Sequence, residues 1–462
     1  MKNGLKFVVP LLIISQMAGA LFSDSKKAGP AVFEAAGAVR DDSAVITSFS
    51  EGAVIPKNMT SITVEWKPAP HSEYAVEYSS GDERRLYYSN IPAAKISCDG
   101  GFPSVFMLRL YVRCAGKIYA GPYVHVRRAE FPVQDSLVYR CVEPFFDPSK
   151  TGLVYVHDVP SGTKRLLFSA QGTCTGCHAF SASNALINVR KGLDRRLFAA
   201  DREGFMNGTD IGTFSYSALS PDRRTMVLVS DSTSRIEKSD SVVEPFNMYY
   251  DKGTLTVRDI RSGAVLASSL KGTDEIRDMP VFSADGAKIY YCRYARTVPI
   301  RSIGIFCSDA SLSNEIEIVH SNTGEFRYFP KTSPNGKWLS FVQGDASHGV
   351  FARKSSDIYL MNLRTRAVSK LELNSEGMES WHTWSSDSRW IAFARNRDPS
   401  RLTSIYLSFI DDSGRASPPF KIAGFDSKKT NMPVFAPGWE KAEQKELLDI
   451  LYPQADGELH AE

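Results

Sequence analysis

After its first 20 residues, the sequence has no hydrophobic run long enough to cross a membrane. It also has no excess of one charge, because 55 Lys and Arg residues accompany 52 Asp and Glu residues and leave a formal net charge of +3. A nucleic-acid partner is therefore not indicated. The sequence contains no Gly-x-Ser-x-Gly nucleophile elbow, which makes an enzyme the weakest of the functions considered below.

The first 20 residues have the pattern of a secretory signal peptide. Lys2 and Lys6 precede an apolar run at Phe7–Ile14, and the small residues 18–20 fit cleavage near Ala20. The apolar run is too short for a membrane span, and no Cys follows the cleavage site to carry a lipid. We therefore expect a protein exported to the periplasm or the cell envelope, where its partner would be another envelope protein.

The strongest chemical signal is the segment 174–178, which reads Cys-Thr-Gly-Cys-His. In such a motif two thiols, here Cys174 and Cys177, form thioethers with the vinyl groups of one porphyrin, and the next residue, His178, is the proximal ligand of the iron. The alternatives are a redox-active thiol pair or half of a zinc site. A four-ligand zinc site needs a second Cys/His pair, which is not visible. The motif predicts one covalently bound haem c.

The other five cysteines are Cys98, Cys114, Cys141, Cys292 and Cys307. Because five is odd, at least one of them has no disulfide partner within the chain. Export permits disulfides, and we consider local bridges between Cys98 and Cys114 and between Cys292 and Cys307. The sequence alone does not decide the pairing.

Hydropathy patterns divide the mature chain into two domains. Residues 21–43 are rich in Ala, Gly, Ser and Lys and predict a flexible lead-in. Residues 44–132 alternate apolar and polar side chains, as in Phe106–Val112, between turn-rich pieces. Short strands at this spacing predict an immunoglobulin- or fibronectin-like β-sandwich. Residues 133–151 are expected to be a connector.

Residues 152–439 repeat a pattern in which an aromatic or apolar residue precedes a Ser-containing turn and an apolar strand. Such recurrence is typical of the blades of a β-propeller. Six residues occupy this anchor position, with Ser as the next residue in the first five and Ala436 in the last, which predicts an all-β protein with six blades: Phe180, Leu219, Phe282, Thr332, Trp384 and Phe435.

The last repeat is incomplete, because almost no strand sequence follows Phe435. The segments Leu153–His157 and Lys164–Phe168 form a strand pair without an anchor, so we expect them to complete the last blade and close the ring. Residues 440–451 have an amphipathic pattern that predicts a short helix, within a C-terminal helix and tail at 440–462.

The Ser-Pro-Asp/Asn-Gly repeats resemble those of TolB-type propellers. The whole chain resembles a family of exported propeller proteins common in Bacteroidetes genomes, in which a Cys-x-x-Cys-His-x-Phe element precedes the repeats. The matching pieces are residues 54–58, 139–140, 174–181, 278–286, 382–390 and 431–435. The chain departs from the family at Asn188 and at residues 217–219, where the family more often has histidines, so no ligand role is carried over there.

Two functions follow from these patterns. The first is a periplasmic haem c protein, in which the propeller frames one haem for electron transfer or sensing. The second is a TolB-like interaction propeller, in which a haem is structural or absent and the propeller binds a protein partner.

His178 and His382 each lie two residues before an anchor, so we expect them to occupy equivalent positions of their blades. On this basis we favour His382 or Met432 as the distal ligand of the iron, although packing is an equal explanation for His382. The other candidates are His125, His157 and Met206. An iron without a protein ligand on its distal side is the remaining alternative.

Overall fold

The computed structural model describes residues 37–70, 72–98, 100–142, 152–170, 174–180, 184–191, 194–201, 214–230, 234–238, 246–250, 253–269, 274–297, 300–345, 353–396, 402–423, 429–441 and 445–446. The described part is all-β, with strands throughout and no α-helix. No helix in these ranges is long and apolar enough to cross a membrane.

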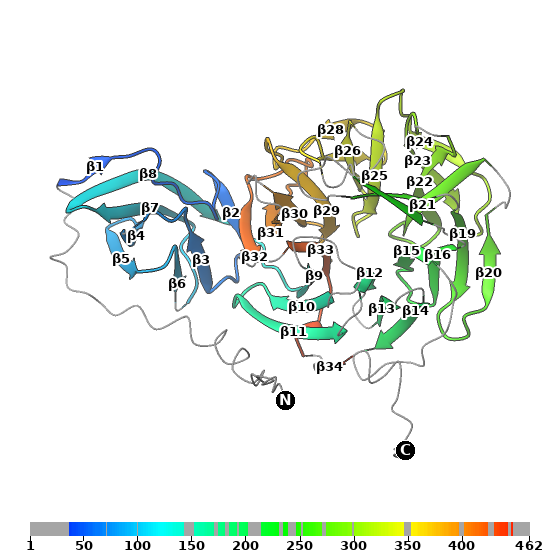
Figure 1. Cartoon of the computed structure of the whole chain (residues 1–462), viewed down its shortest axis with the longest axis horizontal. Coiled ribbons are helices and arrows are strands. Elements are labelled where there is room, and N and C mark those ends of the chain that lie inside the picture. Colours follow the sequence, from blue (N-terminus) through cyan, green and yellow to red (C-terminus); the bar gives the residue numbers. More distant parts are fainter. Residues whose placement is uncertain are drawn as a thin grey trace, which may run out of the picture.

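The N-terminal region consists of two sheets (Figure 1). Its strands are β1 (Val39–Arg40), β2 (Ala53–Ile55), β3 (Ser61–Glu65), β4 (Glu73–Ser80), β5 (Glu83–Ser89), β6 (Ala93–Ser97), β7 (Val105–Cys114) and β8 (Lys117–Arg128). One sheet has the order β1-β8-β7-β4-β5 with β2 also paired to β8, and the other pairs β3 with β6. Side chains from both sheets, such as Val64, Tyr78 and Phe106, are buried in one core.

The strands from Cys174 to Ala423 form a series of antiparallel sheets. Their bounds are β12 (Cys174–Phe180), β13 (Asn184–Lys191) and β14 (Asp194–Asp201); β15 (Phe214–Leu219), β16 (Thr225–Ser230), β19 (Thr254–Asp259) and β20 (Val265–Ser268); β21 (Glu275–Phe282), β22 (Lys288–Ala295), β23 (Gly304–Asp309) and β24 (Ile316–Val319); β25 (Phe326–Thr332), β26 (Trp338–Gly344), β27 (Asp357–Asn362) and β28 (Val368–Lys370); and β29 (Met378–Trp384), β30 (Trp390–Asn396), β31 (Ser404–Phe409) and β32 (Phe420–Ala423). Strands β17 (Ser234–Lys238) and β18 (Phe246–Tyr250) pair separately.

These sheets are arranged radially. Figure 1 shows the first strand of each sheet nearest to the middle, with β20, β24 and β28 at the periphery. Each four-stranded sheet runs from its first to its last strand in sequence order. Repeated four-stranded antiparallel sheets around a centre are the arrangement of a β-propeller.

The Ser-containing repeats form the turns between the first two strands of a sheet. In one copy the Ser283 hydroxyl donates to Asp285 Oδ1 over 2.6 Å and accepts the Lys288 N–H over 2.9 Å. Ser333 makes the same two contacts, with Asn335 Oδ1 over 2.7 Å and with the Trp338 N–H over 3.0 Å. The repeated sequence is therefore explained by local hydrogen bonds that close each hairpin.

One sheet combines strands from both ends of this region. Its strands are β9 (Leu137–Val142), β10 (Gly152–Asp158), β11 (Thr163–Ala170), β33 (Lys429–Phe435) and β34 (Lys445–Glu446), in the order β33-β9-β10-β11-β34. The segments 153–157 and 164–168 thus share a sheet with Phe435, as expected. The expected connector, however, contains β9, which lies between β33 and β10 and pairs with both.

The helix predicted for residues 440–451 is wrong where these residues are described. Trp439–Lys441 form a single 3-10 turn, and β34 pairs with β11 in parallel. Trp439 is buried against Phe168, and the Ser136 hydroxyl contacts the Glu440 carboxylate. These contacts hold the segment against the sheet. Residues 442–444 and 447–462 lie outside the described part.

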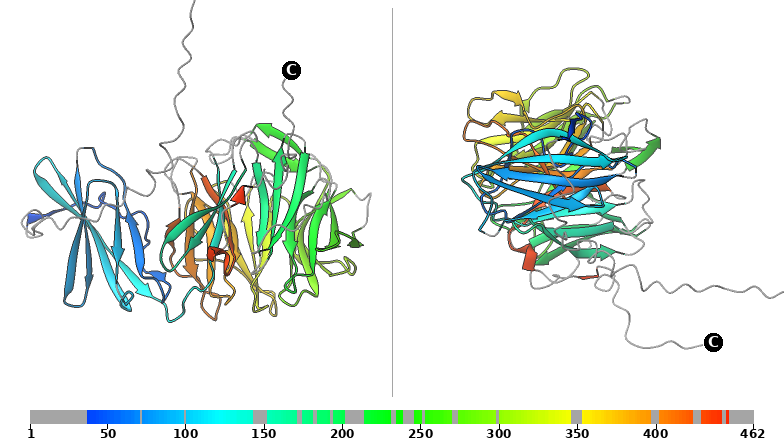
Figure 2. Two further views of the ribbon diagram at one scale, coloured as in Figure 1. Left: turned by 90° about the horizontal axis from the view of Figure 1, so that it is seen from below. Right: turned by 90° about the vertical axis from the view of Figure 1, so that its left-hand side faces the viewer.

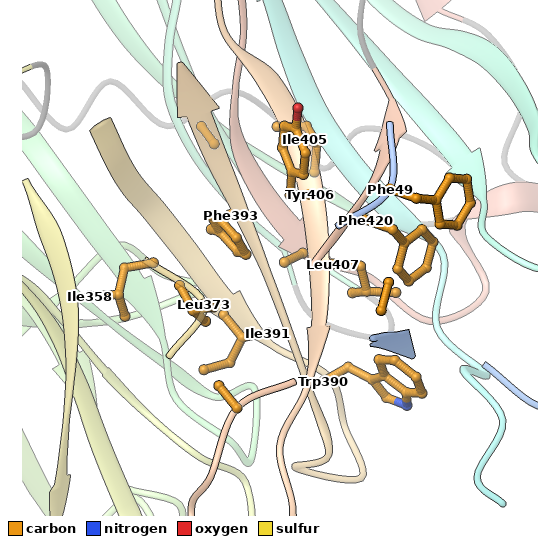
Figure 3. Packing of buried hydrophobic residues seen from close by; sticks show 14 of the residues in the cluster. Phe49, Ile358, Leu373, Trp390, Ile391, Phe393, Ile405, Tyr406, Leu407 and Phe420 are labelled. Carbon is orange, nitrogen blue, oxygen red and sulfur yellow. The ribbon is translucent and has the colours of Figure 1, made fainter. Parts of the chain in front are cut away.

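The N-terminal region packs against the β29–β32 sheet through β2, which contacts β31 and β32, and the left view of Figure 2 shows the blue strands beside the orange ones. The Phe49 and Phe420 rings stack with centroids 5.5 Å apart, next to Leu407 and Trp390 in the same core (Figure 3). The Lys421 N–H donates to the Ser48 carbonyl over 2.7 Å. The segment around Phe49 therefore extends the outer edge of this sheet by one short strand-like piece.

The two disulfides considered from the sequence are not formed. Cys292 and Cys307 lie on the neighbouring strands β22 and β23 as buried thiols, and no bridge joins Cys98 to Cys114. In the ladder Cys292 is opposite Ile305 and Cys307 is opposite Tyr290, so the two thiols are diagonal to one another rather than directly paired. Diagonal neighbours in a sheet are farther apart than the Cβ separation that a disulfide requires.

Candidate functional site

The Cys-x-x-Cys-His segment forms β12, the first strand of the β12-β13-β14 sheet. Cys174 is opposite Arg190 and His178 is opposite Ile187 in the ladder with β13. The motif therefore lies on a strand at the inner side of the ring, next to β33 and β15, against which β12 packs.

The first strand of every sheet in the series carries a β-bulge at a corresponding place. The two residues of each bulge oppose one residue of the partner strand, and the pairs are Gly176–Cys177, Ser215–Tyr216, Met279–Pro280, Phe329–Pro330, Trp381–His382 and Met432–Pro433. In four of them the first residue has a positive φ, between 47° and 53°. Such φ values are strained for a side-chain-bearing residue and persist only where surrounding contacts impose them. Gly176 holds this place in β12, where glycine carries no such penalty.

The bulges bring side chains together in the middle of the ring. Tyr216 of β15 and Phe329 of β25 come from sheets separated by the β21 sheet, yet their ring centroids are 5.7 Å apart. The Phe329 N–H also donates to Met279 Sδ over 3.4 Å. Met279, Phe329 and Trp381 belong to one buried cluster against which Tyr216 and Met432 pack. The bulges therefore bring aromatic and thioether groups together in the middle of the ring.

His382 is buried beside the neighbouring β25–β28 sheet. Its Nε2 and the Trp384 Nε1–H both contact the Ser340 hydroxyl, each over 2.8 Å. Burial, followed by the nearby Lys331 charge, lowers the pKa of His382 to about 3, so the imidazole is neutral at neutral pH. Nδ1 of His382 is buried without a hydrogen-bond partner.

The expected equivalence of His178 and His382 is corrected by the register. His382 is the second residue of its bulge, whereas His178 is the first residue after the bulge of β12. The position equivalent to His382 is therefore occupied by Cys177. Alignment of the two strands on their anchors, Phe180 and Trp384, makes the two histidines look equivalent. The alignment fails at the bulge, because β12 has one more residue than β29 between its bulge and its anchor.

Met432, the other favoured distal ligand, is the first residue of the β33 bulge and is partly buried against the central cluster. Strand β33 packs against both β12 and β29. Met432 therefore lies on a strand adjacent to the motif strand.

The remaining candidates lie in different surroundings. His125 is exposed on β8, with Nδ1 2.8 Å from Glu51 Oε1. His157 is buried on β10, where burial and then the Lys164 charge lower its pKa to about 4. Met206 lies outside the described residues. Within the described ranges no group of three or more His, Cys, Asp or Glu side chains is arranged to hold a metal ion.

Asp278 is a buried carboxyl that the sequence analysis missed. It directly precedes the β21 bulge, and its Oδ1 accepts the Met279 N–H over 2.8 Å. Burial raises the pKa of Asp278 to about 7, and the hydrogen bond from the Met279 N–H lowers this pKa by a smaller amount. Asn431 holds the same place in β33, so the repeated Asp/Asn-Met-Pro-Val-Phe sequence was the available signal.

Replacement of Asp278 by Asn is expected to stabilise the protein at pH 8. An unfolded Asp has a pKa of about 3.9, so the folded state binds more protons between pH 4 and 7 and its stability falls as the pH rises through this window. The gain at pH 8 should be a few kcal/mol, since one pKa unit corresponds to about 1.4 kcal/mol. Thermal melts of the wild type and the variant from pH 5 to 8 measure this gain in stability. Asp82→Asn, at an exposed residue, is the control. A gain that does not increase with pH would contradict the raised pKa of Asp278.

Comparisons with known proteins assign no family to this chain. The sequence matches no family profile and no curated protein. Among solved structures, the hydrazine synthase of Kuenenia stuttgartiensis is 12% identical with a TM-score of 0.39, covering 59% of this chain and 78% of that one. A chain of a nidogen/laminin complex is 10% identical with a TM-score of 0.39, covering 65% and 98%. An oligogalacturonate lyase from Vibrio parahaemolyticus is 9% identical with a TM-score of 0.36, covering 67% and 87%. At these values the likeness assigns no activity.

Proposed function

We propose that the protein is an exported haem c protein whose ring of sheets frames one covalently attached haem, for electron transfer or haem-based sensing. The observation that carries the proposal is the place of the motif. The Gly176–Cys177 bulge of β12 corresponds to bulges of the other sheets whose aromatic and thioether side chains pack together in the middle of the ring. An attachment motif at that place would put a porphyrin beside apolar and aromatic groups, which favour its burial.

The donor set fits a c-type haem. Cys174 and Cys177 have the spacing for two thioether bonds, and His178 follows directly as the proximal ligand. When bound, the haem iron supplies one-electron redox chemistry or binding of a small ligand. The role of the chain is to anchor the ring at two points, to supply the His178 imidazole and to restrict access of water.

For the distal side we propose Met432 ahead of His382. Met432 is partly buried, at the bulge of a strand that packs against β12. His382 already uses Nε2 at the Ser340 hydroxyl and would have to coordinate through the partnerless Nδ1 or give up that contact. An unpartnered, neutral imidazole nitrogen is chemically suited to iron, so His382 stays the second candidate.

We further propose that the radial sheets make six blades, with β12, β15, β21, β25, β29 and β33 as their innermost strands. The support is that each of these strands carries a bulge at the same distance, within one residue, from its turn. The N-terminal region is then a β-sandwich that docks on the blade of β29–β32 and ends near residue 132. It begins before residue 44, the start expected from the sequence, because Val39 and Arg40 of the expected lead-in 21–43 form β1 and pair with β8.

Covalent haem is the direct test. When the protein is produced together with a c-type haem maturation system, the intact mass should include one haem, and haem staining should survive denaturing electrophoresis. Cys174→Ala and Cys177→Ala should each impair attachment, and the double variant should abolish it without loss of the fold. Cys114→Ser, in the N-terminal region, is the matched control and should retain haem. A wild-type mass without haem under these conditions overturns the proposal.

A further inference from the structure

A cavity of about 710 Å³ lies at one end of the β21–β24 sheet. Its lining comes from the start of β21, the end of β22, residues 297 and 301–302 before β23, the first half of β23, and β24 with the residues directly after it. Its volume is within the range of small-molecule binding sites. It is formed by a different sheet from the motif strand, so an inference from it does not depend on the haem proposal.

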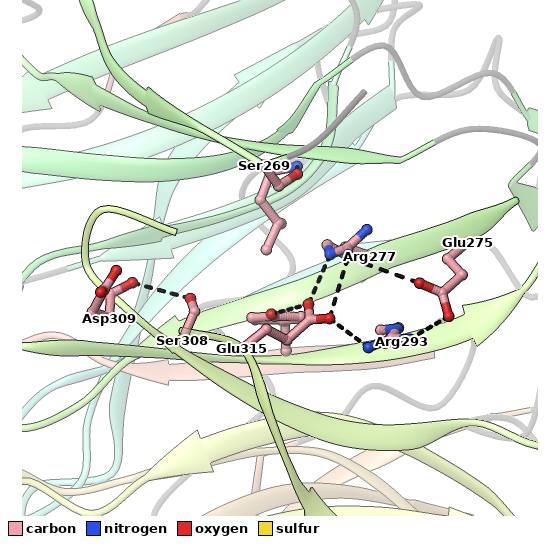
Figure 4. A network of polar contacts seen from close by, with 9 residues as sticks. Ser269, Glu275, Arg277, Arg293, Ser308, Asp309 and Glu315 are labelled. Carbon is pink, nitrogen blue, oxygen red and sulfur yellow. Dashed lines mark hydrogen bonds and ion pairs between the residues drawn. The ribbon is translucent and has the colours of Figure 1, made fainter. Parts of the chain in front are cut away.

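One wall of the cavity holds a fixed guanidinium group. Arg293 is ion-paired with both Glu275 and Glu315 (Figure 4). Its guanidinium carbon lies 4.4 Å from the centroid of the Phe306 ring. Behind it, Arg277 holds Glu315 with its Nε 2.9 Å from the carboxylate. Because both carboxylates and the ring restrain Arg293, a ligand would find this group already in place.

Beside this guanidinium the cavity combines charges of both signs around Gly304, which is paired with Arg293 in the ladder. Arg301 is exposed, and no ion pair or hydrogen bond of its side chain occurs among the described residues. Glu317 lies 3.1 Å from His320 Nδ1 through either oxygen. A Cβ on Gly304 would approach Glu317 Oε1 and Phe306 Cε2 to 3.1 Å each, so glycine keeps the space between them open.

We propose that this cavity binds a small zwitterion of the short-peptide class. The ligand carboxylate faces Arg301, with Arg293 as the second cation, and the ligand ammonium faces Glu317. A polyanion is disfavoured by the two glutamates that line the cavity, Glu275 and Glu317, and a simple cation by the two arginines. A molecule that carries one charge of each sign at its ends satisfies both.

The test compares three ligands that share the same three alanine residues and differ only in their end groups. Trialanine has both end charges, N-acetyl-trialanine only the carboxylate, and trialanine amide only the ammonium. Titration calorimetry on the full mature protein should detect saturable binding of trialanine, and each blocked peptide should bind at least tenfold more weakly. Equal binding of trialanine and its acetylated form would overturn the zwitterion in favour of a plain anion site, and no saturable binding of trialanine would overturn the site itself.

Variants locate the binding in this cavity. Arg301→Gln should weaken trialanine about tenfold, and Glu317→Gln should weaken trialanine while it improves binding of the acetylated peptide. Gly304→Ala should reduce the affinity for all three peptides, because its methyl group enters the cavity. Arg296→Gln removes an exposed charge on the same loop outside the cavity lining, and should leave affinity unchanged. Equal weakening by Arg296→Gln and Arg301→Gln would mean nonspecific charge attraction and would contradict the assignment.

Discussion

A protein that begins at residue 144, between β9 and β10, is expected not to fold cooperatively, even though it retains every Ser-containing repeat. Its β33 would lose its ladder partner, because β33 pairs with β9 from Lys429 to Phe435 and has no pairing with β10. The ring would then be open, with an unpaired edge on β33 and another on β10. Denaturant unfolding followed by circular dichroism should show a broad transition of reduced amplitude.

The matched control begins at Val133 and differs by eleven residues. It keeps β9 and also Asp135, whose carboxylate accepts the Ser386 N–H over 2.6 Å and the Ser386 hydroxyl over 2.8 Å. It also keeps the Ser136 carbonyl that accepts the Ala436 N–H over 2.8 Å. This protein should unfold in one transition. If the two proteins unfold alike, β9 does not close the ring.

The sequence was sufficient for the repeats because the turn chemistry is local. Ser283 and Asp285 form hydrogen bonds within six residues of chain, so the same residue types recur in the sequence at each such hairpin. Strand β9 does not follow such a turn. It pairs with β33, which is distant in the sequence, and with β10, which begins at Gly152. Because β9 is fixed by pairing with distant strands and not by a local turn, its sequence contains no repeat that would predict it.

The register of the site was less predictable for a related reason. A bulge shifts the register of a strand by one residue, and the position of the bulge could not be read from the sequence. His178 and His382 therefore look equivalent when the strands are aligned on the turn, but they are not equivalent when the strands are aligned on the bulge. The positive φ values of Trp381 and Met432 are likewise imposed by packing at the centre of the ring. Local propensity would not place such residues there.

Buried charges were the other feature that the sequence did not reveal. Asp278 and Arg395 carry charged side chains, which are rarely buried without a partner, yet both residues are 2% exposed. Asp278 is buried because it sits at the inner strand, and Arg395 because Glu379 lies on the paired strand directly opposite. Tertiary neighbours, and not composition, decide where these groups lie.

Replacement of Arg395 by Met is expected to destabilise the protein by about 3–5 kcal/mol. Arg395 Nε lies 2.6 Å from Glu379 Oε1, and the pair is almost fully buried, with side-chain exposures of 1% and 0%. The Arg395 guanidinium also donates to the Leu373 carbonyl and lies 5.0 Å from the Tyr406 ring centroid. Without Arg395, Glu379 would be a buried carboxylate held only by Ser375. Urea unfolding at pH 7 measures the change.

The matched control is Arg415→Met, which removes an exposed ion pair with Glu372 at 3.2 Å, where the side chains are 71% and 56% exposed. An exposed pair contributes about 0–1 kcal/mol, so this variant should be nearly neutral. The double variant Arg395→Met with Glu379→Gln should be more stable than Arg395→Met alone, because the uncompensated charge is gone. If the double variant recovers nothing, the loss comes from the packing of Arg395 on Phe393 and Tyr406 and not from its charge.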